Sequence, residues 1–286
     1  MIDSQTPARL ACPILGLAIA AALAVPQSAT AEFDETQVLI EINATDGDAG
    51  FHAKFDAGAW KEVRMNDPDG MKLLDEKAFA NLRLQGLTEN FFESAEPVCD
   101  PEDSEDDEPV VSLAEFISRF PAGDYTLFGK TNEGEHFAGD AELTYDLPAA
   151  PDIDDTDGAA FVDGDPVVIA WGPGEDLGEK CHDPDLIEAE IIADPAEVVV
   201  VGWEVVVEPA DGDGIEPERV FSVQLPPGQT EVTVPAEFIE TYIDVNDVEE
   251  FKFEVGAIEA SGNQTFSEGE FCIVDEAGEE CEEDED

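Results

Sequence analysis

The sequence is poor in basic residues. Lys and Arg together number 12 in 286 residues, against 71 Asp and Glu, and the formal net charge is −59. Nucleic acids and anionic lipid surfaces are bound through Lys and Arg, so this charge excludes both classes of partner. The same charge opposes a compact state by self-repulsion while it keeps the protein soluble. Because dissolved cations screen such repulsion, we expect adaptation to a salty, halophilic setting.

Histidine and catalytic motifs are also scarce. The chain has 3 His residues, and none of its 5 Cys residues belongs to a CxxC motif, which argues against a zinc cluster. No GxSxG motif occurs, and no pair of acids stands out for hydrolysis. Cys181 and His182 are adjacent, but a nucleophile and its base meet in space rather than in sequence. We therefore expect no catalytic residues and no cofactor, with calcium as the one candidate ion.

The only long apolar run lies near the N-terminus. Arg9 precedes LACPILGLAIAAALAV at residues 10–25, and PQSATA follows. This pattern is typical of a secretory signal peptide over residues 1–31, with cleavage after Ala31. The run is short for an N-terminal anchor, and we expect no membrane span after cleavage. The expected destination is the periplasm or the medium.

Four cysteines follow the expected cleavage site, namely Cys99, Cys181, Cys272 and Cys281. An even number in an exported chain favours disulfides, and four cysteines allow three pairings. We expect Cys181 to pair with Cys272. The alternatives are that Cys281 competes for Cys272 and that Cys99 reaches another domain.

Apolar and polar residues alternate with the period of β-strands. In FHAKF (51–55) the apolar residues share one face, while His52 and Lys54 point the other way. Similar alternation occurs in VLIEI (38–42), NLRLQGL (81–87), DYTLFGKT (124–131) and AELTYDL (141–147). The turn signal DPDG (67–70) separates two such segments. Short alternating strands predict an all-β sandwich, with SLAEFISRF (112–120) as a short helical connection.

Three stretches divide the chain. Residues 100–108 hold seven acids in nine positions and are expected to form an exposed loop. Residues 149–164 combine Pro, Gly and Asp and predict a linker. Residues 275–286 are nine acids in twelve and predict a disordered tail. The expected domains are therefore a first sandwich over residues 32–148 and a second over residues 165–274.

The second half resembles a fibronectin type III domain over residues 165–275. The resemblance rests on PVVIAW, which ends in Trp171, then on GWEVVV, QLPPGQTEVTVP and FKFEVGAIEASGNQTFSE. It implies a seven-stranded sandwich with Trp171 and Trp203 in the core. It also implies that residues 251–257 form the sixth strand. Two features depart from the pattern: Phe251 replaces the usual corner tyrosine, and the segment from Gly172 to Glu197 is long for a loop.

The tetrapeptide AEFI occurs twice, at residues 114–117 and 236–239. Each copy precedes a segment that starts with an aromatic residue, Tyr125 in one case and Phe251 in the other. We interpret both copies as plugs at the crossing between the two sheets of a sandwich. This interpretation predicts two tandem immunoglobulin-like sandwiches, and convergence on a short plug is the alternative.

Clustered carboxylates make calcium the leading candidate ligand, because this hard cation takes 6–8 oxygen ligands. The candidate residues are Asp46, Asp48, Asp154, Asp155, Asp157, Asp211 and Asp213. None of these segments matches an EF-hand loop, and Asp-Gly pairs are common in turns. We therefore favour solvated turns for these residues, with a specific calcium site as the alternative.

The function expected from these features is that of an exported, non-enzymatic binding or adhesion-type protein. Its sandwich modules would contact an extracellular or periplasmic macromolecule. The alternative is a calcium- or carbohydrate-binding accessory protein that uses the Asp-rich loops.

Overall fold

The computed structural model describes residues 31–100, 109–153, 155–210, 219–246, 248–277 and Cys281. The expected signal peptide up to residue 30 lies outside the described residues, as do residues 101–108 of the expected acidic loop and most of the expected tail.

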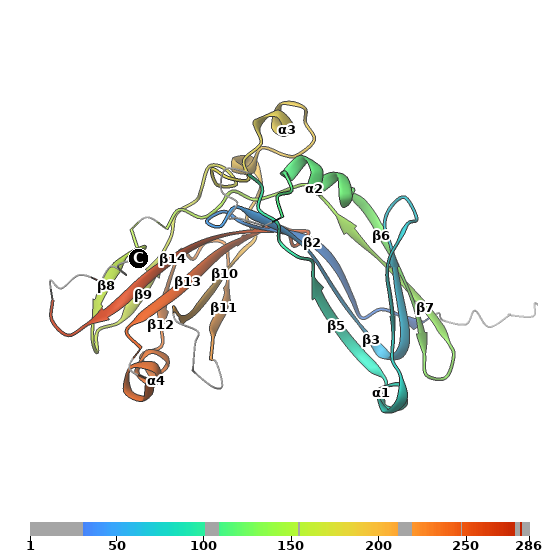
Figure 1. Cartoon of the computed structure of the whole chain (residues 1–286), viewed down its shortest axis with the longest axis horizontal. Coiled ribbons are helices and arrows are strands. Elements are labelled where there is room, and N and C mark those ends of the chain that lie inside the picture. Colours follow the sequence, from blue (N-terminus) through green and yellow to red (C-terminus); the bar gives the residue numbers. More distant parts are fainter. Residues whose placement is uncertain are drawn as a thin grey trace, which may run out of the picture. The chain divides into compact units, whose positions relative to one another are not determined.

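The chain folds mainly into strands (Figure 1). The first half contains β1 (Ala31–Glu32), β2 (Glu35–Asn43), β3 (Asp48–Asn66), β4 (Lys72–Lys77), α1 (Ala80–Gln85), β5 (Leu87–Glu93), α2 (Leu113–Arg119), β6 (Gly123–Thr131) and β7 (His136–Leu143). The second half contains β8 (Ala159–Val162), β9 (Val167–Ala170), α3 (Pro184–Glu188), a 3-10 turn (Pro195–Glu197), β10 (Gly202–Pro209), β11 (Phe221–Leu225), β12 (Glu231–Val234), α4 (Ala236–Asn246), β13 (Glu250–Ile258) and β14 (Gln264–Val274).

The first sandwich is organised around β3, a strand of 19 residues. Its first part pairs with β2 and β5, and its second part pairs with β6 and β4. The register shifts between Asp56 and Trp60 and again between Trp60 and Glu62, and there β3 passes from the strand group of β2 and β5 to that of β4 and β6, within one hydrogen-bonded sheet. The small residues between Asp56 and Trp60 suit such a bend. Both strand groups bury their inner faces in one core that contains Phe55, Trp60 and Tyr125.

The second sandwich places β8, β14, β13, β10 and β11 in one sheet and β9 with β12 in the other. Alternate residues of β13 from Phe251 to Ala257 are fully buried, as the sequence predicts for a strand with one face in a core. Trp171 and Trp203 are buried and contact each other edge to face, with ring centroids 5.9 Å apart. The expected all-β fold class with two sandwich cores is thus confirmed.

Both AEFI segments are helical. The first lies in α2, where Ser112 accepts a hydrogen bond from the backbone N–H of Glu115 and so caps the helix. Phe116 and Ile117 of this copy enter the first core, and Ile239 of the copy in α4 enters the second. The plug interpretation fits both positions.

Two local expectations are wrong. Residues 80–85 form α1 rather than a strand, and Leu82 and Leu84 are exposed, so their alternation does not reflect a buried sheet face. Residues 159–162, within the expected linker, form β8 and pair with β14 in parallel. Alternation and turn-rich composition are both local signals, and neither contains information about a distant pairing partner.

The long segment after Trp171 returns to the first core. Leu177, Cys181, Leu186 and Ile192 all pack there, although they follow β9 of the second sandwich. Composition alone does not reveal this return, because the segment is polar on average and lacks a strand period.

The disulfides differ from the expected pairing. Cys99 is bound to Cys181, and Cys272 is bound to Cys281. The expected Cys181–Cys272 bond is therefore wrong. The physical reason is the return just described: it brings Cys181 to the first core, where Cys99 lies, and away from β14.

The two cores meet along β2 and β14, which pair in parallel over three residues. Asn263, fully buried just before β14, joins them further. Its Oδ1 accepts a hydrogen bond of 2.8 Å from the backbone N–H of Ile40. Its Nδ2 donates to the carbonyl oxygens of Thr144 and Asp146, at 3.1 and 3.2 Å. One amide side chain thus bonds three backbone groups from two separate segments of the first sandwich.

Candidate cation-binding site

Two of the expected calcium ligands lie at the β2–β3 turn. Asn43 Oδ1 accepts hydrogen bonds from the backbone N–H groups of Thr45 and Asp46, which is an Asx-type turn. Asp46 is exposed, and Asp48 is half-buried at the start of β3. Burial and the neighbouring charges of Glu96, Asp46, Glu268 and Glu41 together raise the pKa of Asp48 to about 7. The turn is therefore surrounded by several carboxylates.

The other expected calcium ligands do not lie beside this turn. Asp155 and Asp157 lie just before β8, and both are exposed. Asp157 Oδ1 accepts a hydrogen bond of 3.0 Å from the backbone N–H of Glu270 and so satisfies this donor of β14. Asp154, Asp211 and Asp213 lie outside the described residues. A calcium site at any of these residues stays a prediction.

A different group brings metal-ligating atoms together. Glu41, His52 and Glu96 each offer one ligand atom, and these atoms all lie within 4.8 Å of one another. It is the only such group of three or more within the described part of the chain. His52 Nδ1 lies 3.7 Å from Glu41 Oε2, and His52 Nε2 lies 3.3 Å from Glu96 Oε1.

The strand register explains how these residues meet. Glu41 of β2 pairs with Gly50 of β3, and His52 follows two residues later on the same face of β3. Glu96 follows β5, and the chain there is held to β3 because Ser94 and Phe51 exchange hydrogen bonds. Gly50 leaves room for both partners, since a Cβ at this position would lie 2.5 Å from Glu96 Oε1 and 3.0 Å from His52 Nε2.

His52 is 4% exposed, although its alternation with Phe51 and Ala53 predicts an outward side chain. Phe91 of β5 contacts the imidazole edge to face at 5.7 Å. Burial opposes the charged imidazolium, but the hydrogen bond to Glu96 and the charges of Glu41, Glu96 and Glu93 outweigh it, so the pKa of His52 lies above its ordinary value. From the sequence, Glu41 and His52 could be identified as outward-facing residues on neighbouring strands. Nothing in the sequence points to Glu96.

Further charges line the β2–β14 seam. Lys252 of β13 forms an ion pair with Glu268 of β14, whose side chain is 8% exposed. Asn43 of β2 donates a hydrogen bond to the same glutamate. Burial, together with the neighbouring charge of Glu268, raises the pKa of Glu254 to about 7. Carboxylates thus outnumber cations here, and the seam attracts positive charge.

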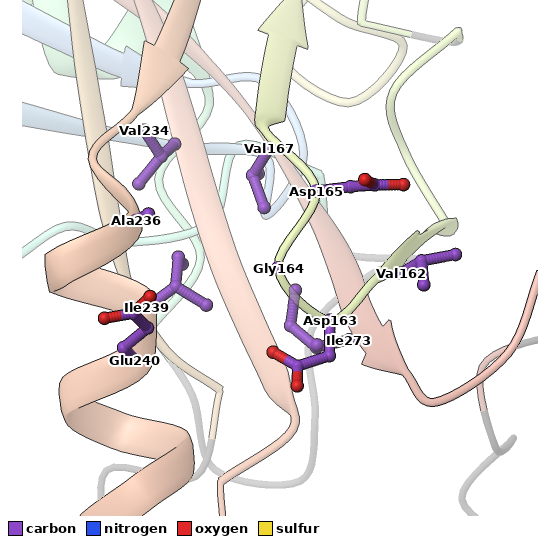
Figure 2. Close-up of a pocket in the computed structure, with 10 residues that line it drawn as sticks. All are labelled: Val162, Asp163, Gly164, Asp165, Val167, Val234, Ala236, Ile239, Glu240 and Ile273. Carbon is purple, nitrogen blue, oxygen red and sulfur yellow. The ribbon is translucent and has the colours of Figure 1, made fainter.

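Two hollows elsewhere do not bring charged or metal-ligating side chains together in this way. An open groove of 640 Å³ lies between the ends of β6 and β7 and residues 187–194, and it includes Tyr145. The Tyr145 hydroxyl is engaged with the backbone oxygens of Ile117 and Phe120. The second hollow, of 20 Å³, lies beside α4. Figure 2 shows Asp165 pointing away from the apolar side chains of Val167 and Val234 there. That volume holds about one water molecule.

Nucleophilic cysteine chemistry is absent from the described residues. All four cysteines of residues 31–286 are in disulfides, so Cys181 is no partner for His182. None of the helices in the described ranges has the length and apolar character that a membrane span requires.

Comparison with known proteins identifies no family. No family model matches the chain, and no curated protein matches it. Among solved structures, the N-terminal Ig1-2 module of the Drosophila receptor protein tyrosine phosphatase DLAR is 12% identical, with a TM-score of 0.32. The match covers 85% of this chain and 98% of that module.

Two adhesin structures are similar at a comparable level. A tetra-tandem repeat from the extending region of a large adhesion protein is 11% identical, covers 85% of this chain and 51% of its own, and has a TM-score of 0.24. A structure from a 1.5-MDa bacterial ice-binding adhesin is 13% identical, covers 84% of this chain and 64% of its own, and also has a TM-score of 0.24. The chain thus spans less than two thirds of either adhesin structure, and at these scores the likenesses do not extend to function.

Proposed function

We propose that the chain is an exported, non-enzymatic binding or adhesion-type protein in which two immunoglobulin-like β-sandwiches, the second of fibronectin type, act as one unit. The observation that supports this most is the backbone connection between the cores, made by the β2–β14 pairing and by Asn263. A tandem joined in this way offers loops and strand edges of both sandwiches to one partner.

Export is supported by the two disulfides together with the signal-peptide pattern at the N-terminus. Disulfides persist in oxidising compartments and are rare where thiols are kept reduced. The proposed destination is the periplasm or the cell exterior.

A non-enzymatic role is supported by the polar groups of the described residues. The cysteines are paired, and the Tyr145 hydroxyl in the larger groove is engaged with backbone oxygens. A nucleophile needs an adjacent base that is itself oriented by a third group, and the groove offers no such series.

The proposed partner is an extracellular or periplasmic macromolecule that tolerates or complements a strongly acidic surface. Nucleic acid is unsuitable, because a chain with 12 basic residues and 71 acidic ones repels phosphate. Complementary charge on the partner would speed the encounter, and contact with loops and strand edges would determine specificity.

Binding of labelled protein to whole cells tests the proposal. Fluorescent protein comprising residues 32–286 is mixed with cells of the producing organism, and retention is measured against concentration. We expect saturable retention that unlabelled protein competes away. An unrelated acidic protein of matched charge is the control for purely electrostatic retention. Retention equal to that control, or turnover of a substrate in a broad hydrolase panel, would contradict the proposal.

A second candidate function is calcium binding at the β2–β3 turn, which the crowding around Asp48 favours. Calcium would stabilise the fold by a saturating increment beyond ionic screening. Thermal unfolding in CaCl2 and in NaCl at matched ionic strength separates the two effects. Equal melting temperatures would leave Asp46 and Asp48 as solvated turn residues. The carbohydrate variant of this candidate would use exposed rings on the sheets, such as Phe91 and Phe128.

A further inference from the structure

We propose that Glu41, His52 and Glu96 form a binding site for a divalent transition-metal ion of the zinc type. The three residues come from β2, β3 and the segment after β5, and their ligand atoms lie within 4.8 Å of one another. This inference goes beyond the proposed function and does not depend on it.

The interatomic distances suit zinc. Zinc binds histidine nitrogen and carboxylate oxygen at about 2.0–2.2 Å in tetrahedral geometry, which places two ligand atoms about 3.3 Å apart. His52 Nε2 and Glu96 Oε1 are 3.3 Å apart. With an ion bound by these two atoms, Glu41 Oε2 lies 3.7 Å from Nδ1, so a small side-chain movement would let this carboxylate become a third ligand or accept the Nδ1 proton. Either role of the carboxylate strengthens metal binding by histidine.

The site is organised before any ion arrives. The imidazole is fixed by its strand, by the edge-to-face contact with Phe91 and by its burial. Gln264 of β14 donates a hydrogen bond to Glu41 Oε2 and orients that carboxylate. Gly50 keeps the space between His52 and Glu96 free of a side chain. Such support reduces the ordering cost of binding.

The donor set selects the class of ion. Calcium and magnesium take oxygen ligands, whereas imidazole suits zinc and its neighbours among the transition metals. Glu96 is 36% exposed at its side chain, so an ion can enter from solvent on that side. The surrounding carboxylates raise the local concentration of divalent cations. The competing arrangement is an imidazolium held between two carboxylates without any metal.

Histidine NMR on the mature protein distinguishes these arrangements. The whole sequence has 3 His residues, so long-range ¹H–¹⁵N correlation spectra give one small set of imidazole signals. ZnCl2 is titrated in a background of excess CaCl2, which occupies nonspecific carboxylates. We expect the signals of His52 alone to move, with saturation at one zinc per chain. Zinc-induced shifts spread over His136 and His182, or no shift at His52, would overturn the proposal.

Variants identify the ligands. His52→Gln should abolish the saturable zinc site measured by calorimetry. Glu96→Gln and Glu41→Gln should each weaken it about 10–100-fold, as loss of a ligand or of its supporting carboxylate does. His136→Gln is the matched control, because His136 is exposed on β7 and should leave zinc affinity unchanged.

Folding of each variant is checked by circular dichroism without metal. If His52→Gln does not fold, Glu96→Gln decides the matter, because its carboxylate is partly exposed and its amide is isosteric. Unchanged zinc affinity in folded Glu96→Gln would overturn the proposal and leave the metal-free imidazolium arrangement.

Discussion

In each sandwich an AEFI tetrapeptide lies in a helix that packs on the core. The tyrosine hydroxyl that bonds to the nearby backbone comes from a different element in each. In the first, AEFI lies in α2, and the strand residue Tyr125 donates a hydrogen bond from its hydroxyl to the carbonyl oxygen of Pro121 at 3.1 Å. In the second, AEFI lies in α4, and the strand offers Phe251, which has no hydroxyl. Tyr242 of α4 instead exchanges hydrogen bonds with the backbone of Arg219.

In each sandwich a tyrosine hydroxyl bonds to the backbone, but a strand provides it in the first and a helix in the second. Phe251 stacks on Phe271 and contacts Tyr242 edge to face, so the ring fills the core while the helix provides the polar group. The departure from the fibronectin pattern at Phe251 is thus accompanied by a hydroxyl from the preceding helix.

The two disulfides should give the largest measurable contrast between the cores. The Cys99–Cys181 bond closes a loop of 82 residues, whereas Cys272–Cys281 closes one of 9. By loop entropy, replacing both cysteines of the first pair with Ser should cost about 4.5 kcal/mol, against about 2.5 kcal/mol for the second. Urea unfolding followed by tryptophan fluorescence measures both. Equal losses would mean that loop length does not govern these bonds.

Asn263→Ala should cost about 3 kcal/mol, because it leaves three backbone groups of the first sandwich without the partner that this residue of the second sandwich provides. The affected groups are the N–H of Ile40 and the carbonyl oxygens of Thr144 and Asp146. The control is Asn132→Ala, since Asn132 Oδ1 is buried without a hydrogen-bond partner in the described structure. If both variants lose the same free energy of unfolding, Asn263 does not couple the cores.

Tyrosine variants test the comparison of the two closures directly. Tyr242→Phe removes a hydroxyl that both accepts from and donates to the Arg219 backbone and should cost about 2 kcal/mol. Tyr125→Phe removes one donated bond and should cost about 1 kcal/mol. Chemical denaturation of both variants gives the two values. A larger loss for Tyr125→Phe would reverse our assignment of the more important hydroxyl.

The smallest expected effects concern charge and have opposite signs. The folded-state pKa of Glu254 is raised to about 7 by burial, so the folded state retains a proton that the unfolded chain releases. Its contribution to stability is present in acid and is lost as pH rises through about 7. Glu254→Gln should therefore stabilise the protein at pH 8, by about 1 kcal/mol after allowance for partial exposure, and have little effect near pH 4.5.

The pKa of Asp75 in the first sandwich is shifted in the opposite direction to that of Glu254. Hydrogen bonds from Lys77 and Lys72 hold its pKa below the ordinary value. Its contribution is present above the unfolded pKa and is lost as pH falls through the lower folded-state pKa. Asp75→Asn should lower the melting temperature at neutral pH and converge with the unmodified protein in acid. Parallel pH profiles for the Glu254 and Asp75 variants would contradict this difference in charge environment.

Sequence periodicity was sufficient for much of the fold. The alternation in β2, β6, β10 and β13 and the DPDG turn predict local structure correctly, because each depends on neighbouring residues. Alternation was insufficient at Leu82 and Leu84, where a helix with exposed leucines has the same local pattern. The return of Cys181 to the first core could not be predicted, because it depends on contacts between segments far apart in sequence.

The candidate metal site shows the same limit. Glu41 and His52 are identifiable as outward residues on neighbouring strands, but Glu96 lies in a loop whose path depends on tertiary contacts. The burial of His52 likewise depends on Phe91 and Glu96, which no alternation pattern places beside it.

The return of residues 177–192 to the first core has a consequence for the order of synthesis. The first sandwich is encoded early, yet its core is completed only after β9 of the second has been made. Cys99 must remain a free thiol while the next 82 residues are delivered, with the other cysteines still to follow. A ribosome or translocon that pauses near residue 160 would therefore hold an unfinished module rather than a completed domain.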